Sequence, residues 1–96
     1  MRKDESKVIL LKKSINQCLE ETLGQSGANA IRFYVDTNIA ASNIHEYARI
    51  LRKVLGPGAA ALEKACAMKL YDNLGLEFRE RDGYTLDKYV EDLGIS

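Results

Sequence analysis

The sequence lacks the features that define membrane-spanning, disulfide-stapled and secreted proteins. Its longest apolar run falls far short of the ~20 residues that a helix needs to cross a bilayer, so no membrane span is expected. Its two cysteines, Cys18 and Cys66, lie within helical patterns and not in a loop framework, which excludes a disulfide-stapled fold. The opening residues MRKDESK carry both charge signs, and no apolar signal-peptide core follows them. These features predict a protein of the reducing cytoplasm.

An excess of charge of either sign is also missing. Fourteen basic and fourteen acidic residues cancel, so the chain has no overall positive field that would attract nucleic acid or an anionic membrane. Nucleic acid is therefore not the expected partner. The charges are unevenly spread, however, because residues 42–56 carry Arg49, Arg52 and Lys53 against Glu46.

The size and composition are those of one folded domain. Splitting 96 residues into two cores would leave each half too small to be stable. Apolar residues make up 46% of the chain and charged residues 29%, which is far from the composition of disordered proteins. We expect a single domain over residues 1–96, with flexible ends at residues 1–4 and 95–96.

The first third of the chain shows helical spacing. Apolar residues three and four apart predict a helix over about residues 5–23, and Gly24 can end it in the left-handed conformation. Ser26 can cap a second helix over residues 28–36. A strand is the competing interpretation, because apolar and polar residues also alternate there, but the cap-like SGANA favours the helix. The apolar ridges of that helix would be Ala30, Ile31, Tyr34 and Val35.

The middle of the chain predicts two helices joined by a tight turn. After a short connector around residues 38–42, Asn43 and Glu46 form the pattern of a capping box that opens a helix over residues 44–55. Gly56 ends this helix, and Pro57 suits the first turn of the next one.

The helix predicted over residues 59–74 is apolar nearly all round, which is typical of a helix that neighbours cover on several sides. We expect it to be the central helix of the fold. Ala65 would then be a core residue, so that Ala65→Glu would unfold the protein.

The end of the chain combines an irregular segment with a last helix. Gly75 and Leu76 fit a Schellman ending, and residues 76–84 predict either an extended arm or a small hairpin with its turn at Asp82-Gly83. Thr85 can cap a short helix with Leu86, Tyr89, Val90 and Leu93 on one face, a contact between Tyr84 and Tyr89 at its start, and Gly94 at its end. The predicted fold is an all-α compact bundle of four to five helices.

No motif for catalysis, a cofactor or a metal is found. The Gly-Pro-Gly of residues 56–58 lacks the spacing, lysine and hydroxyl of a phosphate-binding loop. Cys18, Cys66 and His45 lack the paired spacing of a zinc site, and His45, the single histidine, is expected at the surface. We therefore predict a protein that is not an enzyme, with no catalytic, cofactor-binding or metal-binding residues.

Charged residues on two helices are the candidate interaction residues. In the first helix basic residues precede acidic ones, the reverse of what the helix dipole favours, and a second copy running antiparallel would compensate this order. Solvated surface charge is the alternative for both helices. The candidates are Lys12, Lys13, Glu20, Glu21, Arg49, Arg52 and Lys53.

Two stretches, LEETLGQSGANAIRFYV and LRKVLGPGAAALEKACAMKLYDNLGLEF, resemble a family of small archaeal helical domains, the Nitrosopumilus output domain. The likeness covers roughly residues 8–78. It implies an all-helical domain that occurs alone or attached to signalling modules, and it brings no established activity.

The sequence thus predicts a non-enzymatic protein-interaction module that self-associates, with a homodimer as the expected form, and that serves as a signalling output or adaptor domain. The alternative hypothesis is a non-specific nucleic-acid-binding domain, in which the hairpin Gly56–Gly58 and the adjacent basic residues contact phosphates.

Overall fold

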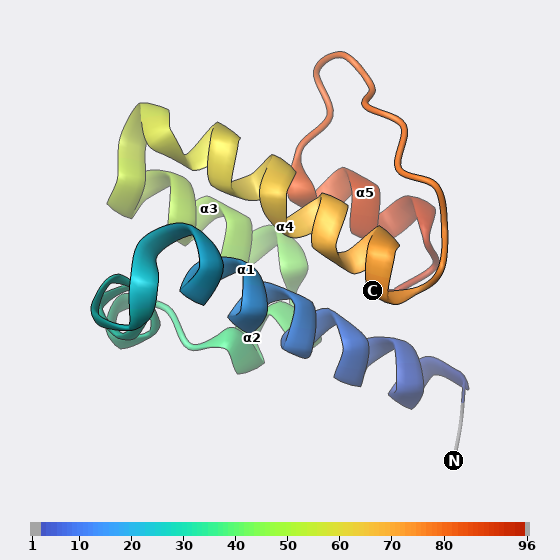
Figure 1. The fold of residues 1–96 in the computed structure, drawn as a ribbon, viewed down its shortest axis with the longest axis horizontal. Coiled ribbons are helices and arrows are strands. Elements are labelled where there is room, and N and C mark those ends of the chain that lie inside the picture. Colours follow the sequence, from blue (N-terminus) through green and yellow to red (C-terminus); the bar gives the residue numbers. More distant parts are fainter. Residues whose placement is uncertain (1–2, 96) are drawn as a thin grey trace.

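The computed structural model describes residues 3–95, and the side chains of residues 6–95. These residues form helices and no strand, which confirms the predicted all-α fold (Figure 1). Of the expected flexible ends, residues 1, 2 and 96 lie outside the described part, and Ile95 is buried in the core. The elements are α1 (Lys3–Tyr34), α2 (Thr37–Ser42), α3 (Ile44–Leu55), the 3-10 turn η1 (Gly56–Gly58), α4 (Ala59–Asn73) and α5 (Leu86–Asp92).

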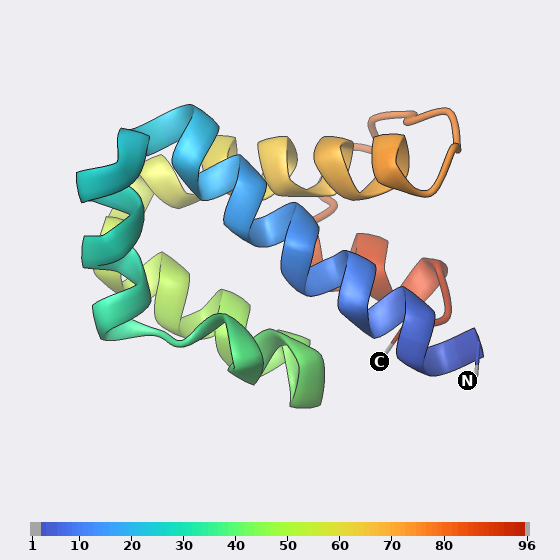
Figure 2. The same cartoon turned by 60° about the horizontal axis from the view of Figure 1, so that its bottom comes forward.

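A sharp kink at Gly24 divides α1 into two helical segments. Gly24 has φ +75° and ψ 172°, a conformation that only glycine adopts readily. The prediction that the first helix ends here is confirmed, and Figure 2 shows the second segment turning away from the first. The predicted cap at Ser26 is wrong, because the second segment is already helical at that residue.

The second segment is a helix and not a strand, but it buries a different face from the predicted one. Ala28, Ile31 and Val35 are buried, whereas Ala30 and Tyr34, which were expected on the buried ridges, are exposed. Both stripes have helical spacing, and the direction of the chain after the kink at Gly24 determines which of them meets the core.

The connector predicted around residues 38–42 is instead the helix α2. The Asp36 carboxylate caps it by accepting a hydrogen bond from the backbone N–H of Asn38 at 2.8 Å. Thr37 and Ala40 are buried beneath it. The helix has only six residues, too few for an apolar period to show in the sequence.

The start of α3 agrees with half of the predicted capping box. The Asn43 side chain accepts from the backbone N–H of Glu46 at 3.1 Å. The Glu46 carboxylate does not reach back, because it binds Arg49 at 2.6 Å and the Asn43 N–H donates to the carbonyl of Ile39. Gly56 ends α3 with φ +59°, as expected.

The helix α4 has nearly the predicted bounds but is not enclosed on all sides. The bundle formed by α1, α3 and α5 covers one face of it, which is the face that holds Leu62, Cys66 and Leu70. The other face is open to solvent, including Ala60 and Ala61. Alanine favours a helix without needing burial, so an alanine-rich sequence overstates how much of the helix is covered. Ala65 is only half-buried, and the expectation that Ala65→Glu unfolds the protein is withdrawn.

The segment between α4 and α5 is an extended arm and not a hairpin. Gly75 N–H donates to Asp72 and Leu76 N–H to the carbonyl of Tyr71, which confirms the Schellman ending. The arm then loops outward to the turn at residues 82–83 (Figure 1). Rings hold the arm to the helices, since Tyr71, Phe78, Tyr84 and Tyr89 form a chain of contacts with centroids 5.0–6.2 Å apart.

Thr85 occupies the position before α5, but its side chain does not cap the helix. Its hydroxyl donates to the carboxylate of Asp87. Leu86, Tyr89 and Val90 are buried as predicted, and Leu93 is half-buried. The end of the chain returns to the start of α1, where the Lys7 ammonium donates to the carbonyl of Leu93 at 3.2 Å.

Candidate interaction surface

A cluster of charged side chains joins α3, α4 and α5. The guanidinium of Arg52 donates to both carboxylate oxygens of Glu63, at 3.0 and 2.8 Å, and to Asp87 at 2.8 Å. Glu63 is only 4% exposed, and it also accepts from the backbone N–H of Leu86 at the start of α5. Each buried carboxylate therefore has a charged partner, which a buried charge requires.

His45 extends this cluster to the surface. Its Nδ1 lies 2.8 Å from Asp87 and its Nε2 lies 3.3 Å from Glu91. The hydrogen bond to Asp87 raises the pKa of His45 above its usual 6.5. The predicted surface location is correct, but the contacts to α5 were not foreseen.

The pKa of Asp87 reflects all of these contacts. Burial raises it, but the hydrogen bonds from Thr85, His45 and Arg52 together outweigh the burial and lower the pKa to about 2. The donors around Asp87 thus stabilise its charged form. Because Arg52 pairs with both Glu63 and Asp87, the cluster holds α3, α4 and α5 together.

Sequence reasoning missed Glu63 and Asp87. The available signal was the position of Glu63, which lies on the same stripe of the α4 sequence as Leu62, Cys66 and Leu70. A charged residue on an apolar stripe calls for a partner, and Arg52 lies near the end of the preceding helix.

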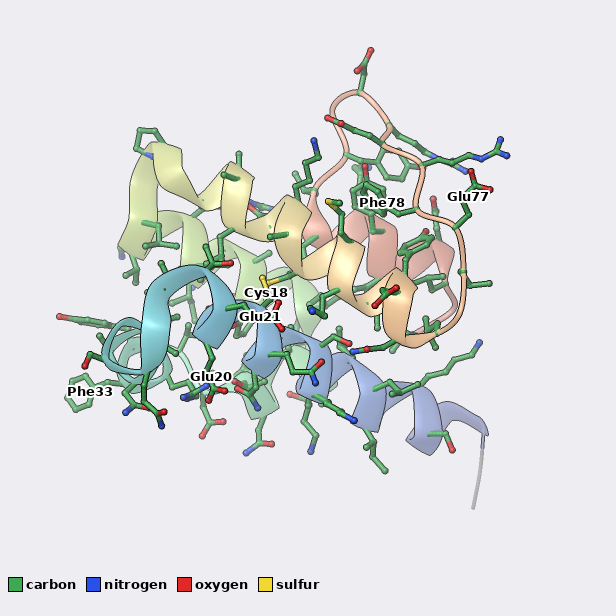
Figure 3. All side chains as sticks on the ribbon, viewed as in Figure 1. Cys18, Glu20, Glu21, Phe33, Glu77 and Phe78 are labelled. Carbon is green, nitrogen blue, oxygen red and sulfur yellow. The ribbon has the colours of Figure 1, made fainter. Side chains whose placement is uncertain are left out.

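The structure does not bring the predicted interaction residues together on one surface. Most have partners within the chain: Lys12 donates to Asn38, Glu20 pairs with Arg32, Glu21 with Lys69, Arg49 with Glu46, and Arg52 with Glu63 and Asp87. Lys13 and Lys53 are exposed and have no ion-pair partner among residues 6–95. Figure 3 labels Glu20 and Glu21 near the kink of α1.

The residues considered as zinc ligands are also apart. Cys18 and Cys66 are free thiols buried in the core, as expected of core cysteines, whereas His45 binds the carboxylates of α5. Within the described part of the chain, no three His, Cys, Asp or Glu side chains lie close enough to hold a metal ion.

An aromatic pair projects from the end of α1. Phe33 is 86% exposed and Tyr34 is 64% exposed, and their rings pack edge to face at 5.7 Å. Figure 3 shows Phe33 pointing away from the bundle. We call this pair the aromatic projection. The predicted apolar ridges already left out Phe33 but included Tyr34, so the sequence did not single out the pair.

An apolar hollow of about 430 Å³ lies between α4 and the arm. Met68 and Leu76 are each about half exposed there, and Phe78, labelled in Figure 3, lies on the arm beside it. Lys69 and Asp72 supply charge at its edge. The lining residues are Ala65, Met68, Lys69, Asp72, Leu76 and Phe78.

Two further observations bear on what the protein is. Among residues 3–95 there is no helix of the length and apolar character that crossing a membrane requires. Comparison with models of known protein families, with curated proteins and with solved structures finds no match. The resemblance to the Nitrosopumilus output domain therefore stays a prediction from the sequence.

Proposed function

We propose that the protein is a non-enzymatic interaction module that associates with a second copy of itself through the aromatic projection. The observation that carries this proposal is the exposure of Phe33, whose ring contacts Tyr34 and contributes little to its own core. Burying one such side chain contributes about 1.5–3 kcal/mol. Aromatic residues are enriched in protein interfaces and depleted from surfaces that stay in water.

The apolar hollow is the surface that would receive the projection. Its lining is mainly apolar, and the flexible side chain of Met68 can adapt to an inserted ring. The projection and the hollow lie on different elements of the same chain. The projection of one copy can therefore enter the hollow of the other copy. This supports self-association more directly than the charges of α1 do, because Glu20 and Glu21 already have partners within the chain.

A role as a signalling output or adaptor domain rests on the sequence resemblance to the archaeal family, and the cytoplasmic location that we propose rests on the two free core cysteines. Self-association suits such a role, because a dimer couples two attached or bound modules. In this role the protein connects the two modules that its dimer couples.

The alternative, a non-specific nucleic-acid binder, has less support. Arg52 is neutralised by Glu63 and Asp87, and Arg49 is neutralised by Glu46, so Lys53 is the one member of the basic set with no acidic partner among residues 6–95. Filter binding at low and moderate salt tests this alternative. A salt-sensitive affinity for DNA or RNA would favour it over self-association.

Sedimentation equilibrium over a wide concentration range tests the proposal. We expect the apparent mass of the wild type to rise with concentration, and Phe33→Ser to stay monomeric. Ile9→Ser is the matched control, because Ile9 is also an exposed apolar residue of α1 but lies far along the helix from the projection. A wild type that is monomeric throughout, or equal weakening by both variants, would contradict the proposal.

A further inference from the structure

Cys18 of α1 and Cys66 of α4 face each other across the interface of the two helices. Two contacts show that the helices run antiparallel: Asn73 donates to Ser14 at 2.8 Å, and Lys69 pairs with Glu21 at 2.8 Å. Cys18 lies between Ser14 and Glu21, and its side chain lies between α1 and α4 in Figure 3. The contact of its sulfur with the carbonyl oxygen of Leu62 places it beside the turn of α4 that leads to Cys66.

The Cys18 sulfur reaches the part of α4 that holds Cys66. The Cys18 thiol lies 3.9 Å from the carbonyl oxygen of Leu62, one turn before Cys66, and Cys66 is the group that most strongly shifts the pKa of Cys18. Both side chains are buried in the core cluster.

The surroundings make the two thiols different. The hydrogen bond from Cys66 lowers the pKa of Cys18 although burial opposes it, and the hydroxyl of Thr22 and the ammonium of Lys69 act in the same direction as Cys66. The hydrogen bond with Cys18 and burial raise the pKa of Cys66. Cys18 is therefore the sulfur that ionises first, and a thiolate is the reactive form of cysteine.

We propose that Cys18 and Cys66 form an intramolecular disulfide when the protein meets a hydroperoxide. The Cys18 thiolate attacks one peroxide oxygen, so that an S–O bond forms, the O–O bond breaks and the hydroxide released takes up a proton to give water (for hydrogen peroxide). Cys18 is then a sulfenic acid. The sulfur of Cys66 attacks it, the S–S bond forms, the S–O bond breaks, and the Cys66 proton leaves with that oxygen as a second water. The two sulfurs together give up the two electrons that reduce the peroxide.

Thr22 is a surface residue in contact with Cys18. It is exposed, and its hydroxyl lies 3.8 Å from the Cys18 sulfur. The kink at Gly24 follows two residues later, so the helix next to Cys18 is near a break where local opening costs least. The disulfide would tie α1 to α4 and close the chain between residues 18 and 66, which stabilises the fold by restricting the unfolded state.

Intact-mass analysis of the folded, reduced protein after treatment with hydrogen peroxide tests this proposal. The treated protein is then denatured in N-ethylmaleimide. We expect the mass to fall by two hydrogen atoms, no maleimide to add, and Tm to rise by about 10 °C or more until dithiothreitol reverses the change. In Cys66→Ala, dimedone should instead trap the sulfenic acid at Cys18.

Two results would overturn the inference. One is a wild-type protein that still takes up two maleimides after peroxide, or whose cysteines advance to sulfinic or sulfonic acids. The other is a disulfide that joins two chains on a non-reducing gel. The proposed function is unaffected by either result, because the thiol pair lies in the core and the aromatic projection does not contain it.

Discussion

Removing the guanidinium of Arg52 should destabilise the protein more than removing any other exposed positive charge. Arg52→Met keeps much of the length of the side chain but leaves Glu63 buried with one remaining donor, the backbone N–H of Leu86. Asp87 loses one donor and keeps Thr85 and His45. The main consequence is therefore an uncompensated carboxylate at position 63.

The expected magnitude follows from the burial of the two partners. Breaking a fully buried ion pair costs about 3–5 kcal/mol. The side chain of Glu63 is 5% exposed but that of Arg52 is 39% exposed, so water already weakens the pair, and we expect a loss of about 2–3 kcal/mol. A domain of this length has a free energy of unfolding of roughly 5–14 kcal/mol. Tm should fall by about 10–20 °C.

Urea unfolding followed by circular dichroism, on both single variants and the double variant, measures this loss. Adding Glu63→Gln to Arg52→Met removes the buried charge and keeps an oxygen that can accept from Leu86. The double variant should thus be more stable than Arg52→Met alone, with a coupling free energy of about 1 kcal/mol or more. Single effects that simply add, or an Arg52→Met protein as stable as the wild type, would refute the reasoning. Lys53→Met is the matched control and should change the free energy of unfolding by less than about 0.5 kcal/mol.

Three further predictions concern the core and the charged cluster. Ala67→Glu should abolish folding because Ala67 is fully buried. Ala65→Glu, on the half-buried side of the same helix, should give a folded protein with a cooperative melt. A folded Ala67→Glu protein together with an unfolded Ala65→Glu protein would show that the other face of α4 lies in the core. Tyr47→Phe should raise the free energy of unfolding by about 1 kcal/mol, because the buried Tyr47 hydroxyl has no hydrogen-bond partner among residues 6–95, and a clear loss in urea unfolding would show that it has one. His45 has a raised pKa, so its contribution to stability is complete below pH ~6.5 and is lost as the pH rises through the higher folded-state value. His45→Gln should remove this decline, and melting curves from pH 5 to pH 9 that stay parallel for both proteins would argue against the contact with Asp87.

Local chemistry made the helix ends predictable. Gly24, Gly56, Gly75 and Gly94 all have positive φ and all stand where the sequence predicts a helix to end. Glycine adopts this conformation with little steric cost, so its position alone carries the information. The cap at Asn43 is predictable for the same reason, since its partner lies three residues away.

Features that depend on tertiary packing were not predictable in this way. The choice between two apolar stripes after Gly24 depends on where the kink directs the chain, and the open face of α4 depends on which neighbours reach it. The contacts of Arg52 with Glu63 and Asp87 join residues 11 and 35 positions apart, and no pattern of neighbouring residues records them. The exposure of Tyr34 belongs to the same class, because it depends on which stripe meets the core and not on the residue type.

The most direct test of the central claim is an NMR dilution series that follows the amide of Phe33 and the methyl group of Met68. If the aromatic projection of one copy occupies the apolar hollow of another, both signals shift together as the concentration rises, and Phe33→Ser abolishes both shifts. Signals that stay fixed at every concentration, or shifts confined to the charged residues of α1, would contradict it.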